Sequence, residues 1–255
     1  KLCQRLIADD PPERVVQAAA DTFYANRRHP RQIALTLRTI LLSDEFKDPA
    51  TWGRKIKRPF EYIVSAMRAA RCDYTWRFDD SDSDRFLRLY HATGQRLYWW
   101  RTPDGYPDNR AAWLGSSTLV QNWRTVDWLV DENHNDQGSR VMRLIDTTLA
   151  NFAGDPTPRE LVAFWCHWIL GFTPNGGWVG PTGTEYDKEP TALGRALMQF
   201  ITQQGFEGNN DGSEFPPDEG IPRDELQNDR WPERWHERLR GMVQLILWSP
   251  NFMQR

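Results

Sequence analysis

The sequence predicts an all-α fold, an irregular multi-helix globular domain with two long aromatic-rich loops. Apolar residues recur at the 3.6-residue spacing of a helix through most of the 255 residues. Proline, glycine and short polar residues interrupt this pattern where helices should start and stop. No alternating apolar and polar stretch is long enough to predict a strand. We therefore expect about nine helices in a single domain that spans residues 1–255.

Four of these helices are expected in the first third of the chain, with apolar stripes over residues 15–23, 33–41, 60–70 and 86–90. Asp9-Asp10-Pro11-Pro12 is a start signal for the first, with an acidic cap and proline in the first turn. The acidic segment 79–84 caps the fourth, because carboxylates favour the positive end of the helix dipole. Ser43 is expected to cap a short turn after the second helix, and Ser249 a similar turn after the final one.

Five further helices follow, with apolar stripes over residues 119–130, 141–152, 161–169, 193–201 and 235–246. The third of them opens with Thr157-Pro158-Arg159-Glu160, which is a capping box with proline in the first helical position. The opening residues, KLCQRLIADDPP, resemble the end of a helix already under way. We therefore expect the chain to be the C-terminal part of a larger protein.

Two aromatic-rich loops interrupt the helices. The stretch from Gly94 to Trp123 holds four tryptophans and two tyrosines, and residues 172–190 form the second loop. Such a loop is either a packed structural plug, which the residues alone favour, or one wall of a binding groove. On the groove interpretation, the two loops face each other, and the candidate ligand-binding residues are Trp99, Trp100, Tyr106, Trp113, Trp178 and Tyr186.

The composition excludes several classes of protein. The net charge is −3, and the 32 basic and 35 acidic residues are interleaved, so no basic field exists to bind nucleic acid. No apolar run reaches the roughly 18 residues that span a bilayer. Cys3, Cys72 and Cys166 are most simply buried thiols, although one disulfide is possible. No nucleotide motif or metal-ligand spacing occurs, so we predict neither cofactor nor metal.

Two groups of charged residues remain as candidates for chemistry. The basic run over residues 54–58 either holds a phosphate or carboxylate at the following helix start or, as we favour, is a solvated linker. Asp104 and Asp108 lie among aromatic residues, as the paired carboxylates of glycosidases do. Asp104 in Pro-Asp-Gly is equally an ordinary turn residue. Both aspartates are therefore weak catalytic candidates.

A resemblance to a known family rests on four segments in a distinctive order and on the serine-aromatic helix endings. The segments are Lys57–Tyr62, Gly94–Tyr98, Pro103–Pro107 and Trp113–Leu119. Over most of its length the chain resembles the bacterial family called domain of unknown function 1800. Members usually carry another helical portion before the point where Lys1 stands, and they commonly begin with an export signal. The resemblance implies a periplasmic or secreted protein, and it supplies no catalytic residues.

Two functions are compatible with these observations. The first is a binding or assembly module with an aromatic groove, whose partner is the missing N-terminal portion, another protein chain or a glycan. The alternative is a carbohydrate-active enzyme, a glycoside hydrolase or lyase, that uses the loop carboxylates.

Overall fold

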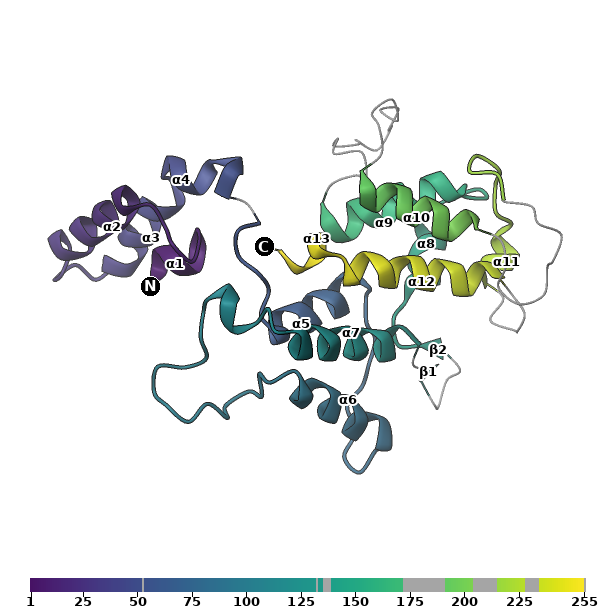
Figure 1. Ribbon diagram of the computed structural model, residues 1–255, viewed down its shortest axis with the longest axis horizontal. Coiled ribbons are helices and arrows are strands. Elements are labelled where there is room, and N and C mark those ends of the chain that lie inside the picture. The colour runs from purple at the N-terminus through teal and green to yellow at the C-terminus, as the bar shows by residue number, and fades with distance from the viewer. Residues whose placement is uncertain are drawn as a thin grey trace.

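The computed structural model describes residues 1–51, 53–131, 133–134, 139–171, 191–203, 215–227 and 234–254. It confirms the all-α fold (Figure 1). These residues form thirteen α-helices, nine of which have eight residues or more. The nine long helices correspond to the nine predicted from apolar periodicity.

The first 51 residues, which we call the N-terminal unit, lie to one side of the remaining helices (Figure 1). Its elements are α1 (Leu2–Leu6), α2 (Glu13–Ala25), α3 (Gln32–Leu41), α4 (Asp44–Lys47) and the 3-10 helix η1 (Pro49–Thr51). Helices α2 and α3 pack as a hairpin, and α1 lies across them. The unit has its own small core, formed by Cys3, Ile7, Ala8, Val15, Ala19 and Ile40.

The second part, which we call the main body, begins at α5 and surrounds α12. Its helices are α5 (Pro59–Ala69), α6 (Ser81–Ala92), α7 (Ser116–Asp131), α8 (Leu144–Asn151), α9 (Pro158–Leu170), α10 (Ala192–Thr202), α11 (Arg223–Gln227), α12 (Arg234–Trp248) and α13 (Pro250–Met253), with the 3-10 helix η2 (Arg110–Ala112) before α7. Helix α12 packs against α7, α8, α9, α10, α11 and α13. Its buried side chains, among them Leu239, Met242 and Val243, occupy the centre of the larger core.

Extended backbone is confined to short pieces in the described part of the chain. Strand β1 (Asn133–His134) pairs antiparallel with β2 (Ser139–Arg140). Residues 53–58, which we call the strap, join the N-terminal unit to the main body. The strap runs beside the C-terminal residues, because Ile56 forms a bridge with Gln254 and the Lys57 N–H donates to the Met253 carbonyl at 2.7 Å.

Most of the predicted helix caps are confirmed. The Ser43 and Ser249 hydroxyls accept from the Phe46 and Phe252 N–H groups at 3.2 and 3.3 Å. The capping box of α9 is formed by Thr157 and Glu160. The predicted cap of α2 is wrong, since the N-cap is Pro12 and makes no side-chain bond. Asp9 instead bonds to residues far along the chain, as described below.

Of the two predicted aromatic-rich loops, the structure describes the first and not the second. The first is described throughout: between α6 and η2 the chain runs as a long irregular segment that extends away from the helices (Figure 1). The second loop, residues 172–190, lies outside the described residues, as do its candidates Trp178 and Tyr186. The expectation that the two loops face each other therefore stays a prediction.

Helix α12 approaches α10 so closely that a side chain at one glycine position would have to displace its neighbour. A Cβ atom added at Gly241 would lie 2.7 Å from Phe200 Cζ. Replacing Gly241 with Ala should lower the free energy of unfolding by about 1–2 kcal/mol, because overpacking outweighs the higher helix propensity of alanine. Denaturant unfolding measures this. In a Phe200→Leu background the same substitution should cost less, and an equal cost in both backgrounds would contradict the clash.

Candidate functional site

The first aromatic loop forms an exposed surface, which we call the aromatic arm (residues 96–106). Every residue from Arg96 to Gly105 is exposed. Tyr98, Trp99 and Trp100 are 102, 61 and 42% exposed. Three neighbouring large aromatic side chains thus face solvent, whereas soluble proteins usually bury such groups.

The base of the arm is packed instead of exposed. The Trp100 and Tyr106 rings are 4.7 Å apart between centroids, and the Tyr106 and Trp113 rings 5.9 Å apart. Trp113 is 7% exposed, and its indole N–H donates to the Pro107 carbonyl at 2.8 Å. The sequence offered a plug and a binding surface as alternatives. The loop is packed at its base and exposed at its tip, because its rings run from the surface at Trp100 into the interior at Trp113, and the binding surface stays a prediction.

The outgoing side of the arm is fixed by the main body and by its own side chains. The Gln95 side-chain oxygen accepts from the Phe60 N–H at 2.9 Å, and the Tyr106 hydroxyl donates to the Arg96 carbonyl at 2.7 Å. The Arg96 guanidinium lies 3.8 Å from the centroid of the Trp99 ring. This cation–π contact holds one face of Trp99 against a positive charge and leaves the indole largely exposed.

Asp104, the first catalytic candidate, is exposed within the arm. Its carboxylate accepts from the Thr102 hydroxyl and from the Trp100 indole N–H, the latter at 3.3 Å. These two bonds, Thr102 first, lower the pKa of Asp104 below its usual value. Asp104 is therefore ionised at neutral pH and suits the role of acceptor or base better than that of an acid.

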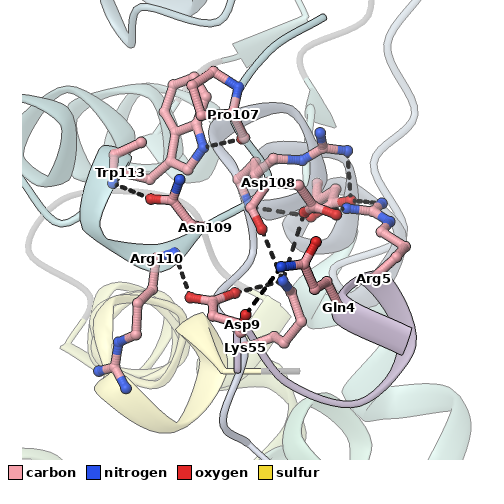
Figure 2. Close-up of polar contacts among 12 residues, drawn as sticks. Gln4, Arg5, Asp9, Lys55, Pro107, Asp108, Asn109, Arg110 and Trp113 are labelled. Carbon is pink, nitrogen blue, oxygen red and sulfur yellow. Dashed lines mark hydrogen bonds and ion pairs between the residues drawn. The ribbon is translucent and has the colours of Figure 1, made fainter. Parts of the chain in front are cut away.

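Asp108, the second candidate, belongs to a charged network that joins four segments, namely the N-terminal unit, the strap, α5 and the end of the first aromatic loop (Figure 2). We call this network the clamp; its members are Arg5, Asp9, Lys55, Glu61, Asp108 and the N–H of Arg110. Arg5 donates to the Asp108 carboxylate at 2.9 Å and also pairs with Glu61 of α5. The catalytic role of Asp108 stays a prediction, and its observed contacts join the arm to the N-terminal unit.

Lys55 lies at the centre of the clamp. Its side chain is 5% exposed, and its ammonium donates to the Asp9 carboxylate at 2.5 Å and to the Asp108 carbonyl at 2.9 Å. The other Asp9 oxygen accepts from the Arg110 N–H at 2.7 Å. A buried cation requires such partners, because an unpaired charge away from water is costly. Asp9 therefore ties the N-terminal unit both to the strap and to the start of η2.

The rest of the basic run is also engaged by the protein itself. Arg54 donates to the Ala50 carbonyl at 2.9 Å, and Arg58 pairs with Glu61 at 3.1 Å. Lys57 donates to the Phe252 carbonyl and lies 3.6 Å from the centroid of the Phe252 ring. Burial lowers the pKa of Lys57 to about 8. The run is thus a set of structural contacts, where the sequence favoured a solvated linker over an anion site.

The remaining candidates lie apart from the arm. All three cysteines are free, and burial raises the pKa of Cys72 and of Cys166 to about 12, so both thiols are inert at neutral pH. A hollow of about 770 Å³ between α1, α2 and α3 is lined by residues such as Leu2, Val16 and Phe23, none of them from the arm. Among the helices that the structure describes, none has the length and apolarity to cross a membrane.

Sequence reasoning missed Arg5, Asp9 and Lys55 as parts of the site. Asp9 was interpreted as a helix cap because Asp-Asp-Pro-Pro matches that local signal. Its partners Lys55 and Arg110 lie 46 and 101 residues away. The one signal in the sequence was the high density of positive charge in the basic run, which requires negatively charged partners nearby.

The fold and site define a class: an all-α protein of two packed parts, with an exposed aromatic arm held at its base by a charged clamp. The family model described as "Protein of unknown function (DUF1800)" matches residues 1–254, and the chain belongs to this family. Comparisons with curated proteins and with solved structures each find no match.

The clamp predicts an acid dependence of stability. Burial acts to raise the pKa of Asp9, but hydrogen bonds from Lys55 and the Arg110 N–H outweigh it and hold the pKa below the usual 3.8. A carboxyl whose pKa is lowered on folding stabilises the fold above its ordinary pKa, and this contribution disappears as the pH falls through the lowered value. Unfolding free energies measured from pH 7 down to pH 2 should therefore decrease more for the natural chain than for Asp9→Asn, with the difference appearing below about pH 4. Identical acid dependence would contradict the assignment.

Proposed function

We propose that this protein is a binding and assembly module that docks onto another protein through its aromatic arm. The observation that carries the proposal is the exposure of Tyr98, Trp99 and Trp100 side by side on a fixed loop. Burying these rings against a partner would remove a large apolar area from water, which favours association by about 25 cal/mol per Å² before the cost of ordering.

The chemistry of the arm favours a protein partner. Tryptophan, tyrosine and arginine dominate the energetic centres of protein interfaces. The arm presents Trp99 and Trp100 beside two exposed arginines, Arg96 and Arg101. Small ligands are usually enclosed in concave sites, whereas the arm extends outward from the helices (Figure 1). A partner with a recess fits this shape better than a free small molecule does.

A rigid arm would also lower the entropic cost of binding. The arm is attached on its outgoing side through Gln95 and on its return side through Trp113 and Asp108. Side chains that are already ordered lose less conformational freedom on association. We also propose, as the family resemblance implies, that the protein is exported to the periplasm or beyond. Its partner would then lie outside the cytoplasm.

A photo-crosslinking experiment tests the proposed partner. Tyr98 is replaced by a photoreactive phenylalanine derivative in cells that produce the protein natively, and adducts are identified by mass spectrometry. We expect a discrete protein adduct that is lost when Trp99 and Trp100 are changed to Ala, because those rings supply most of the buried area. The same crosslinker at Tyr24, which is 70% exposed on α2, is the matched control.

Two results would contradict the protein-partner proposal. One is the absence of any adduct specific to position 98. The other is a glycan array on which the natural chain binds a saccharide and the Trp99→Ala, Trp100→Ala variant does not, since sugar rings stack on exposed indoles in the same way. That second result would assign the arm to a glycan.

The enzymatic alternative is favoured by one observation, the ionised Asp104 carboxylate exposed among aromatic rings. If the arm cleaves a glycan, Asp104→Asn should reduce turnover by about 100-fold or more while leaving glycan binding intact. Product release from a saccharide library, measured by mass spectrometry, checks this. Asp104 is a cleaner test than Asp108, because Asp108 also holds the clamp. Equal turnover by the variant would exclude Asp104 from the chemistry.

A further inference from the structure

The two ends of the aromatic arm are held by different parts of the molecule. The outgoing end belongs to the main body, where Gln95 accepts from Phe60 N–H of α5 and its carbonyl accepts from the Tyr90 hydroxyl of α6. The return end, by which we mean residues 107–110 directly after the arm, is held by the N-terminal unit and the strap at Asp108 and Arg110 (Figure 2).

Removing the N-terminal unit from its place would take away two of the long-range bonds of the return end and leave the bond from Lys55 of the strap to the Asp108 carbonyl. Asp108 would lose the hydrogen bond from Arg5, and Arg110 would lose the acceptor on Asp9. Pro107 and Asn109 would keep only local bonds, from the Trp113 indole at 2.8 Å and the Ala112 N–H at 3.0 Å. The rings of Trp100 and Tyr106, which contact each other at a tilt, lie directly before this segment, so its release would free them as well.

The attachment of the N-terminal unit is itself mainly electrostatic. The unit keeps its own core, separate from the core around α12, so it does not need the main body to bury its apolar side chains. Its described bonds to the main body run through Arg5 and Asp9, whose partners carry charges or are backbone N–H groups. It is joined to the strap by the Asp9–Lys55 pair and, at the junction itself, by the Ala50 and Thr51 carbonyls, which accept from Arg54. The Arg5 side chain is 36% exposed, so dissolved salt screens the Arg5 pairs, and it screens the more deeply buried Lys55–Asp9 pair less.

We infer that docking of the N-terminal unit sets the conformation of the aromatic arm, and that Arg5, Asp9 and Lys55 are its positioning residues. The inference rests on the proposed function for its biological meaning, since it makes partner binding depend on a docked unit. Binding and docking are then linked, because a partner that prefers the docked arm must strengthen docking by the same factor.

The test uses the full chain labelled with 5-fluorotryptophan, with the fluorine resonances of Trp99, Trp100 and Trp113 assigned by Phe substitutions. Trp76 is the internal reference, because it is 46% exposed yet packs on Tyr74 and Phe86, away from the clamp. Small-angle scattering reports independently whether the N-terminal unit has separated from the main body.

The positioning variant is Asp9→Asn, and Arg14→Gln is its matched control. Arg14 also forms ion pairs, at 2.7 Å with Glu45 and 3.3 Å with Asp44, but both lie within the N-terminal unit. Asp9→Asn should enlarge the particle and shift the Trp100 and Trp113 resonances while Trp76 stays unchanged. We expect the undocked population to rise by about tenfold, as loss of one charged hydrogen bond would give. Arg14→Gln should change none of these signals.

Raising the salt concentration of the natural chain to about 1 M supplies the same test without a substitution, since the screening length falls to about 3 Å. The Trp100 and Trp113 signals should move as they do in Asp9→Asn, in step with the scattering. The inference is overturned if the unit separates while these resonances stay fixed, or if neither Asp9→Asn nor salt separates it. Neither readout requires a ligand, so failure here is distinct from an absent adduct at position 98.

Discussion

The ammonium group of Lys55 imposes the constraint on which the arrangement of the two parts depends. A nearly buried cation cannot be left unpaired, so an aspartate from the N-terminal unit and the carbonyl of Asp108 must both approach it. Satisfying one charge thereby brings together three segments that are distant along the chain. This requirement also fixes the base of the aromatic arm, because Asp108 and Arg110 lie where the arm returns to the helices.

The arm shows how one loop can serve both as a packed element and as a surface. Trp113 is buried, and its N–H bonds to Pro107, whereas Trp99 remains exposed under the guanidinium of Arg96. The buried ring orders the backbone, and the ordered backbone keeps the exposed rings in place. A flexible loop with the same residues would have collapsed its indoles onto the nearest apolar surface.

The sequence predicted the helices well because their signals are local. Apolar stripes identified the nine long helices, and the capping box of α9 and the serine caps at Ser43 and Ser249 were confirmed. The site was predicted less well, because its contacts are long-range. Asp9 resembled a cap, and nothing in its neighbourhood revealed Lys55. The sequence also did not distinguish exposed from buried side chains. Trp100 and Trp113 belong to one aromatic stretch, and their different exposure comes from how the folded chain packs around them.

The pairing of the strap with the C-terminal residues has a consequence for the order in which the molecule forms. Lys57 contacts Phe252, 195 residues further along the chain. During synthesis, the hairpin of α2 and α3 has only short loops to close and can fold as soon as it emerges. The strap can pair with the C-terminal residues only after α13 has left the ribosome. Residues 1–51 are thus made well before the C-terminal residues with which the strap pairs, and until then they are joined to the growing chain by a strap that has not yet paired.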